Sequence, residues 1–550
     1  MNPRNALREL LRMMAPPANG DDLSMVAAEV KEIFESAPLM SSTPFGEPVR
    51  DLIQLIGAPK ADKNLEKHAA LISAFTNEVL ALIDNDYIAA LLNRLEEILV
   101  HRVHLPPSFS DRAVEIQALT GTLLSLLLDR GASVESLFQL YRQIITRLNP
   151  PKQFDFGRRF ALMRKVIAAP PREFEVVFAL DNVSNPENFP SVIGGVSFSA
   201  QPPDVPNPKP AVSKYLTTNP RRLFATVRTQ TQDFRTAGSH AYVKVNDILD
   251  LVRFEYERER LHLHEEFVIT DGRKQHRVYP IPKVVPNQTT QLAPAELEVF
   301  VASVNELAGS QAFAGDGRDR VQAAFRLYRM GADSNIFENK LVHWWTATEH
   351  LVTASSGIAR AVEEALVPVL CLRYVGKLLQ SHRNALVDLK IELLDPANGQ
   401  PIQLRDLSMV DLFTLFTRPD NQQPLLAAVN SPYAREKLAE FVARITDAAA
   451  LQLMLARHEQ RVRWQIQRLW RARCNIVHSA ERSVNAALLC ANLEFYLKTT
   501  LTALLAALRN VPTLASPKEF FDRQAHAYRM LLAELPTGGR QRLHAALSSV

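Results

Sequence analysis

Arg473 and His478 are the residues whose types and spacing could support a reaction. They lie in the segment QRLWRARCNIVHSAERSVNAALL, with four residues between them. RNA can be cut without a metal when its own 2′-hydroxyl attacks the adjacent phosphate, which requires a base and a cation. Histidine exchanges protons near neutral pH and can take the hydroxyl proton. Arginine offers a planar fork of donors to phosphate oxygens. The pair is therefore sufficient for transesterification that leaves a 2′,3′-cyclic phosphate and a 5′-hydroxyl.

The spacing of the two residues constrains where the helix must end. Residues five apart on a regular helix are separated by about 140° around its axis, so they do not share a face. Ser479 and Ser483 suit a turn and a helix N-cap. We therefore expect His478 at or beyond the end of one helix and a new helix from about Ser483.

The same region resembles a known family. LWRARCNIVHSA is similar to the Arg-x(4–6)-His motif of HEPN ribonucleases, which follows one apolar helix and precedes another. Upstream, FENKLVHWWTATEHLV and RVQAAFRLYRMG resemble the Apea-like branch, in which a Trp is followed by a Glu; here these are Trp344, Trp345 and Glu349. The resemblance covers residues from about 295 to 510 and implies an all-α bundle there.

The resemblance implies a function as well as a fold. It implies a metal-independent endoribonuclease without a cofactor, with Arg473 and His478 as catalytic residues. Two protomers of the family bring their motifs together across a dimer cleft, so a homodimer is expected. Many such proteins are regulated antiphage-defence or toxin effectors, so RNA (tRNA or mRNA) is the expected substrate and a phage-derived trigger is a candidate partner.

Four further residues are candidates for support or RNA binding: Asn475, Glu349, Arg471 and Arg468. The family commonly has Asn, Asp or His directly after the motif arginine, whereas this chain has Cys474. Asn475 could take that polar role. Glu349 could orient a motif residue across the bundle or form a structural salt bridge.

Several of these residues can also be explained by a purely structural role. The arginines before the motif could form a solvated face with Glu459 as a partner rather than an RNA-binding surface. Trp344 and Trp345 favour core packing over base stacking. His262 and His264 alternate on a predicted strand, but no third ligand indicates a metal site. The alternative function is a non-catalytic HEPN-like helical module for dimerisation and RNA or nucleotide binding.

The elements that must position these residues fall into three regions, and the predicted fold is mainly α and multidomain. Residues 1–149 repeat apolar residues at three- and four-residue spacings, typical of a helical bundle. Residues 150–290 contain 15 of the chain's 34 prolines, all between Pro150 and Pro286, and their composition favours an α+β domain. Its predicted strands are residues 173–180, 191–200, 223–230, 261–270 and 276–281, with a loop at 201–210 and a helix near 237–252. Residues 291–550 are predicted to form the HEPN-like helical domain and a helical tail.

Charge and composition set limits on location and partners. Residues 1–150 carry 14 Lys+Arg and 19 Asp+Glu, and the remaining 400 carry 49 and 40, so the C-terminal part is basic at +9. This excess is compatible with a polyanion such as RNA. No apolar run reaches the roughly 18–20 residues that a membrane span needs. Three cysteines without a CxxC spacing fit a reducing cytoplasm and no zinc cluster.

Overall fold

The structure is a computed structural model of the 550-residue chain. It describes residues 2–14, 20–57, 68–106, 108–142, 155–205, 208–217, 220–255, 261–270, 278–280, 294–313, 315–334, 336–352, 357–394, 400–479 and 486–548.

The chain is mainly helical with one small antiparallel sheet, which confirms the predicted fold class. It divides into two compact units, Met1–Lys283 and Val284–Val550. The first unit holds a helical part and the sheet, and the second is helical. Each unit is described by itself below.

The helical part of the first unit is built from amphipathic segments whose apolar faces form one core. Tyr87, Leu91 and Leu119 are fully buried in it, and Phe160 joins the same core from a helix that follows residue 150. The helices are α1 (Pro3–Met14), α2 (Gly20–Ser36), α3 (Gly46–Ile56), α5 (Ala69–Leu82), α6 (Ile88–Glu96), α7 (Phe109–Asp129), α8 (Val134–Leu140) and α9 (Phe156–Ile167), with π-helical turns η1 (Ile83–Tyr87) and η2 (Glu97–His101).

Arg4 ties the first helix to two others. Its Nε lies 2.5 Å from Asp84 and its Nη1 lies 2.5 Å from Asp129, whose side chain is 1 % exposed. Charge-assisted pairs of this kind are among the stronger hydrogen bonds in proteins. The two carboxylates outweigh the effect of burial and raise the pKa of Arg4. The N-terminal helix is thus fixed electrostatically as well as by apolar contact.

The sheet has the order β2-β3-β4-β1-β5-β6, with β1 at its centre. Strand β1 pairs antiparallel with β4 and β5, so that Val176 lies opposite Val227 on one side and Ile269 on the other. The strands are β1 (Arg172–Asp181), β2 (Val192–Ile193), β3 (Val196–Ser199), β4 (Leu223–Thr231), β5 (His262–Thr270) and β6 (Tyr279–Pro280), with a 3₁₀ turn η4 (Pro186–Asn188).

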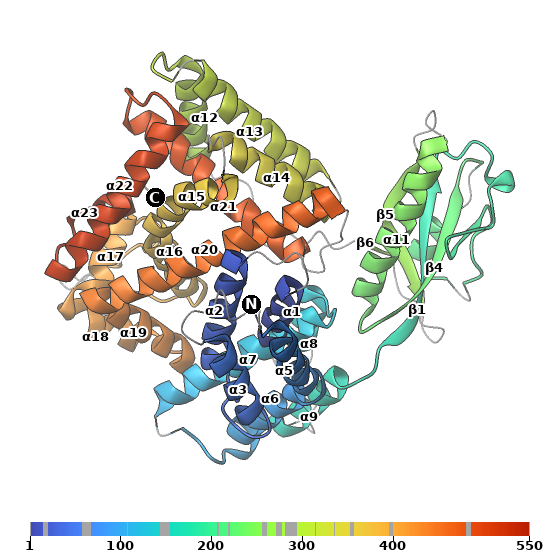
Figure 1. The fold of residues 1–550 in the computed structure, drawn as a ribbon, viewed down its shortest axis with the longest axis horizontal. Coiled ribbons are helices and arrows are strands. Elements are labelled where there is room, and N and C mark those ends of the chain that lie inside the picture. Colours follow the sequence, from blue (N-terminus) through green and yellow to red (C-terminus); the bar gives the residue numbers. More distant parts are fainter. Residues whose placement is uncertain are drawn as a thin grey trace. The chain divides into compact units, whose positions relative to one another are not determined.

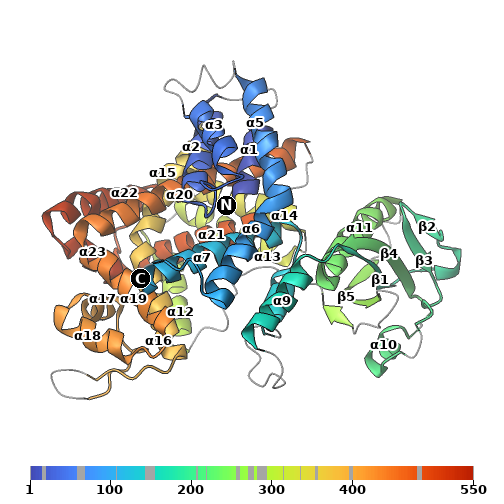
Figure 2. The same ribbon diagram turned by 90° about the horizontal axis from the view of Figure 1, so that it is seen from below.

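Two helices cover the two faces of the sheet. Helix α11 (Phe234–Glu255) packs through Ala237, Ala241 and Val245 on one face, and the short α10 (Pro210–Tyr215) covers the other (Figure 2). The helix predicted near 237–252 and the strands predicted at 173–180, 223–230 and 261–270 are confirmed.

Residues 191–200 form a hairpin, β2 and β3, rather than one continuous strand. Gly194 and Gly195 both have positive φ, 56° and 77°, in the two-residue turn. Such a turn matches the twist of the flanking strands and favours residues without a Cβ. Of the strand predicted at 276–281, Tyr279–Pro280 pairs with β5, and residues 276, 277 and 281 lie outside the described residues.

The second unit is a bundle around the long helix α20, the orange helix in Figure 1. Its helices are α12 (Pro294–Gly309), α13 (Asp316–Asp333), α14 (Phe337–Leu351), α15 (Ile358–Leu372), α16 (Tyr374–Asp388), α17 (Met409–Thr417), α18 (Pro419–Ala428), α19 (Pro432–Thr446), α20 (Ala448–Ser479), α21 (Ala486–Asn510), α22 (Pro517–Glu534), η5 (Leu535–Thr537) and α23 (Gln541–Ser548).

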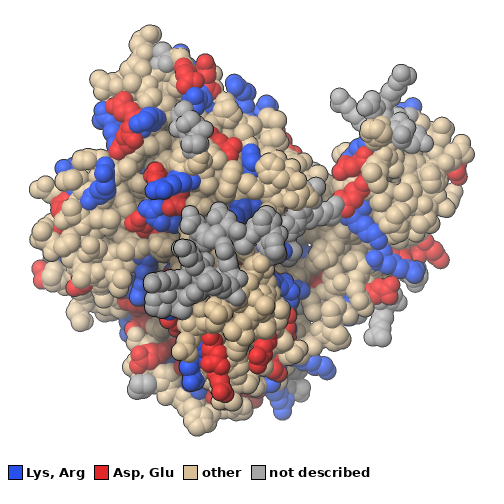
Figure 3. Space-filling view, viewed as in Figure 1, with Lys and Arg blue, Asp and Glu red and all other residues tan. Residues whose placement is uncertain are grey.

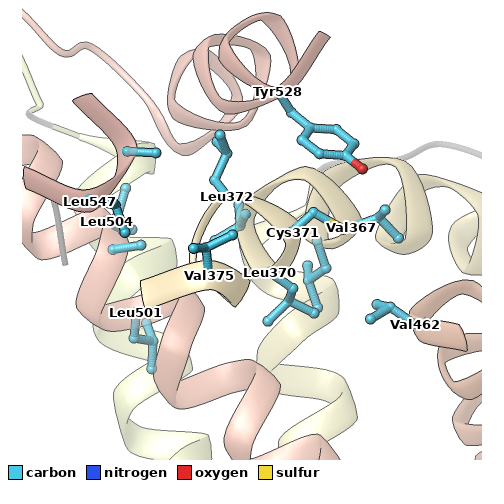
Figure 4. Close-up of a cluster of buried hydrophobic side chains, with 14 of the residues drawn as sticks. Val367, Leu370, Cys371, Leu372, Val375, Val462, Leu501, Leu504, Tyr528 and Leu547 are labelled. Atoms are coloured by element: carbon cyan, nitrogen blue, oxygen red, sulfur yellow. The ribbon is translucent and has the colours of Figure 1, made fainter. Parts of the chain in front are cut away.

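The core of this unit lies where α15 meets α20, α21 and α22. Helix α15 is buried over its last turns, and Leu504 and Val462 approach it from neighbouring helices (Figure 4). Tyr528 extends from α22 toward α15 in the same view. Burying such side chains contributes roughly 1.5–3 kcal/mol each. This apolar contact fixes the direction of α20 within the unit.

His382 gives the second unit a pH-dependent stability. Its ring stacks on Phe441 with centroids 4.2 Å apart. Burial, and secondarily the charge of Lys437, lowers the pKa of His382 to about 4. The unfolded chain binds the proton near pH 6.5, so the free energy of unfolding decreases as pH falls from about 6.5 to 4.

We predict that His382→Asn has a shallower pH dependence of stability than the parent. The parent should lose about 2 kcal/mol through this group between pH 7 and 5, and the variant should not. Urea unfolding followed by tryptophan fluorescence measures this, since all four tryptophans lie in the second unit. His526→Asn, at an exposed histidine, is the control. Equal slopes for parent and His382→Asn would contradict the prediction.

Candidate functional site

Two tryptophans join α14 to α20 beside the Arg–His motif. The rings of Trp345 and Trp470 lie 5.7 Å apart at 42°. Trp344 and Trp345 are 1 % and 0 % exposed, which confirms the packing interpretation of both residues. The indole of Trp344 donates to the carbonyl oxygen of Tyr328 at 2.9 Å. The Trp345–Trp470 contact sets the distance between the helix that holds Glu349 and the helix that holds Arg473, whereas the hydrogen bond of Trp344 joins α14 to α13.

Glu349 is held between a neutral donor and a cation. One turn after Trp345 on α14, its Oε1 accepts a hydrogen bond from the indole Nε1 of Trp345 at 2.6 Å. Its Oε2 lies 3.8 Å from Nη2 of Arg473. Both side chains of the ion pair are 20 % exposed. The carboxylate is therefore oriented by Trp345 and presents its second oxygen to Arg473.

Arg473 keeps most of its hydrogen-bonding capacity. Its guanidinium lies over the ring of Trp470, with Cζ 5.4 Å from the ring centroid. The Glu349 pair is longer than a hydrogen bond, so Nη2 keeps its donors. Nε has no hydrogen-bond partner among the described residues, but it is enclosed by protein atoms. A phosphate could therefore bind through the terminal nitrogens without displacing a short hydrogen bond.

His478 lies in the last turn of α20 and is exposed. The helix continues to Ser479, so His478 is inside it rather than beyond its end. The rotation of about 140° from Arg473 therefore remains, and the two side chains leave the helix in different directions. One chain does not bring Arg473 and His478 together. Ser483, predicted as an N-cap, lies outside the described residues.

The supporting candidates occupy different environments on the same helix. Asn475 is exposed, while Arg471, Cys474 and Arg468 are half-buried, and Arg468 donates through Nη1 to Gln465. Glu349 contacts Arg473.

Arg463, one of the arginines before the motif, forms ion pairs with two carboxylates. Its Nη2 donates to Glu459 at 2.8 Å, and its Nη1 donates to Glu363 on α15. Arg463 therefore has the structural role, as a partner of Glu459, that was considered beside RNA binding. On the face shown in Figure 3, Lys and Arg side chains are interspersed with Asp and Glu and do not form one continuous basic surface.

The two histidines of β5 belong to a structural network. The rings of His262 and His264 lie 5.4 Å apart, and Nε2 of His264 lies 2.7 Å from Asp181. Asp181 also accepts two hydrogen bonds from Arg222, at 2.7 and 2.9 Å, which holds the pKa of Asp181 well below its usual range. Among the described residues, no group of three or more His, Cys, Asp or Glu could hold a metal.

Sequence reasoning did not assign Trp345 and Trp470 a part in positioning the site. The signal was the helical spacing: Trp345 precedes Glu349 by four residues and Trp470 precedes Arg473 by three, so each tryptophan shares a face with its charged neighbour. That these faces of α14 and α20 pack against each other depends on the tertiary structure and cannot be read from the spacing.

Comparisons with protein-family models, with curated proteins and with solved structures found no match to this chain. None of the helices in the described ranges is both long and apolar enough to cross a membrane.

We predict that Trp345→Phe destabilises the second unit more than Trp464→Phe. Both tryptophans are buried, but only Trp345 loses a hydrogen bond, because Nε1 of Trp464 has no partner in the described part of the chain. The difference should be about 1–3 kcal/mol, the cost of leaving a buried acceptor unpaired.

Urea unfolding followed by the three remaining tryptophans measures both variants. The two substitutions remove the same volume, so Trp464→Phe serves as the matched control. Equal destabilisation would mean that the Trp345–Glu349 hydrogen bond does not stabilise the site.

Proposed function

We propose that this protein is a metal-independent endoribonuclease of HEPN type. The resemblance of the motif region to that family supports this. The structural observation that supports it most is the environment of the Arg473 guanidinium. This guanidinium is held over Trp470, next to a carboxylate 3.8 Å away, with donors left for a phosphate. A purely structural arginine would be expected to form short hydrogen bonds, as Arg463 does.

In the proposed reaction His478 removes the proton from the 2′-hydroxyl of the RNA. The 2′-oxygen then bonds to phosphorus, the bond from phosphorus to the 5′-oxygen breaks, and that oxygen takes up a proton from water. Arg473 stabilises the charge that develops on the phosphate oxygens. Glu349 and Trp470 hold the guanidinium in place, since a fixed donor costs little reorganisation during the reaction. No metal or cofactor takes part.

The direction of the two side chains favours a site made by two copies of the chain. Within one helix Arg473 and His478 are about 140° apart, so a single chain presents them to different surroundings. A two-fold dimer can place His478 of one copy near Arg473 of the other. We therefore propose a homodimer whose sites each combine residues from both chains.

A nuclease that cuts cellular RNA must be restrained. We therefore propose that the protein is a cytoplasmic, regulated antiphage-defence or toxin effector that cuts tRNA or mRNA and responds to a phage-derived trigger. The first unit would then sense the trigger or inhibit the nuclease. This part of the proposal rests on analogy with HEPN proteins.

The direct test is incubation of the purified chain with total tRNA and with mRNA in EDTA. The parent should leave 2′,3′-cyclic phosphate ends, and His478→Ala and Arg473→Ala should reduce cleavage by about 100-fold or more. Arg457→Ala on the same helix and His526→Ala on α22, both at exposed positions, are the controls. Cleavage that survives both motif substitutions would place the chemistry elsewhere. A parent that binds RNA without cutting it would favour the non-catalytic module.

Mixing the two inactive variants tests the shared site. In a mixed dimer, the intact Arg473 of one chain meets the intact His478 of the other at one of the two sites. Random assortment should therefore restore about a quarter of the parent activity. The mixture should be unfolded and refolded together so that subunits exchange. No recovery in a mixture shown to contain mixed dimers would mean that each site uses residues of one chain.

A further inference from the structure

The helical part and the sheet of the first unit have separate apolar cores. The buried side chains of the helical part, with Leu91 and Phe160 among them, form one cluster. Those of the sheet and of α10 and α11 form two others, and no described residue belongs to both the helical cluster and a sheet cluster. Apolar packing therefore holds each part together but does not join one part to the other.

A short linker attaches the sheet to the helical part at one point. It runs from the end of α9 at Ile167 to the start of β1 at Arg172, and it contains Pro170 and Pro171. Proline has no backbone N–H, so neither residue can donate a hydrogen bond to the strands or helices at its ends. The residue before a proline is also kept extended. The linker therefore separates the two parts without binding either of them laterally.

The carboxylate of Asp233 makes a second attachment. Its Oδ1 caps α11, because it accepts hydrogen bonds from the backbone nitrogens of Arg235 at 2.9 Å and Thr236 at 3.0 Å. Its Oδ2 accepts from the backbone nitrogen of Ser133 at 2.9 Å, and the hydroxyl of Ser133 donates to Oδ1 at 3.1 Å. The hydroxyl of Thr236 donates to the carbonyl oxygen of Gly131 at 2.7 Å. The contact is thus polar and joins the start of α11 to the start of α8.

Two side chains of opposite charge flank this contact, and each has a buried atom without a partner. Glu135 follows Ser133 by two residues, and its Oε2 has no hydrogen-bond partner in the described part of the chain. Arg235 follows Asp233 by two residues, and the same holds for its Nε. Burying such atoms unpaired costs free energy. A change in the angle between α8 and α11 that brought the two side chains together would remove both costs.

We propose that the sheet turns as a rigid body on the helical part, about a hinge formed by the proline linker and the Asp233 contact. A body held at two points, without a shared core, keeps one rotation about the line through those points. In the second position of the hinge Glu135 pairs with Arg235. The few polar contacts at Asp233 are easier to rearrange than an apolar core, because water can replace hydrogen bonds but not apolar packing.

The hinge links the position of the sheet to a helix of the other part. Asp233 binds Ser133, and the hydroxyl of Ser133 in turn caps α8 by accepting from the backbone nitrogen of Ser136 at 3.2 Å. A partner that bound the sheet and turned it would therefore act on the first turn of α8. The inference does not depend on the proposed nuclease activity.

Asp233→Asn tests the contact, because asparagine keeps one acceptor oxygen for the cap of α11 but loses the second, which binds Ser133. Hydrogen exchange of the full chain, followed by mass spectrometry, should become about tenfold faster in residues 131–137 and stay unchanged in β1 and α7. Asp155→Asn is the matched control, since Asp155 caps α9 by accepting from the backbone nitrogen of Arg158 at 2.8 Å. Faster exchange throughout the strands would mean that Asp233 stabilises the sheet itself, and would overturn the hinge.

Distances between the two parts measure the turning directly. Spin labels can be placed at Leu71→Cys on α5 and Val192→Cys on β2, which are exposed positions. A Cys474→Ser background leaves two native cysteines, both of them buried. The parent should show two populations of distances, one for each position of the hinge.

Charge variants decide whether the second position depends on the ion pair. Glu135→Gln should lose one of the two populations, and so should Glu135→Arg. Adding Arg235→Glu to Glu135→Arg should restore that population, because the exchanged charges can pair again. A single narrow distance in the parent that Asp233→Asn and Glu135→Gln leave unchanged would overturn the proposal. So would a loss of the population in Glu135→Arg that Arg235→Glu does not restore.

Discussion

The buried stripe of α20 determines what each functional residue of the second unit faces. Leu455, Val462 and Leu469 follow one another at seven-residue spacing and are buried against the core. This stripe fixes the rotation of the helix about its axis. Arg473 lies about 40° from Leu469 and remains next to the core, whereas His478 lies about 180° from it. The position of each motif residue is therefore a consequence of apolar packing that begins at Leu455, about five turns before Arg473.

Much of the fold follows from local patterns in the chain. The three long strands of the sheet and the helix of residues 234–255 form where the pattern of apolar residues favours them, although the pattern of the helix is ambiguous in the sequence. The turn at Gly194 and Gly195 was not predicted, although two glycines between β-branched residues are typical of a hairpin. The α9 helix is less evident, because it follows a proline-rich segment and buries a single aromatic side chain, Phe160, fully in the helical core.

The site is less predictable than the fold because its contacts join distant segments. Arg473, His478 and Glu349 can be chosen from residue types and from the resemblance. That Glu349 faces Arg473 depends on the Trp345–Trp470 contact, whose partners are 125 positions apart in the chain. The end of α20 was uncertain for a similar reason. Serines at residues 479 and 483 suit a turn, but α20 runs through His478 to Ser479 although the side chains of residues 477–479 are exposed.

Two arginines of one helix show why residue type alone does not reveal function. Arg463 forms hydrogen bonds with two carboxylates, whereas Arg473 has one carboxylate at 3.8 Å. In sequence both stand on the long helix α20 with aromatic and polar neighbours. The energetic difference lies in what compensates the charge, because a partly buried cation with incomplete pairing costs stability that a bound anion would return. The degree of pairing therefore separates the two residues: it gives Arg463 a structural role, and it is the reason why we propose Arg473 as the residue that binds a phosphate.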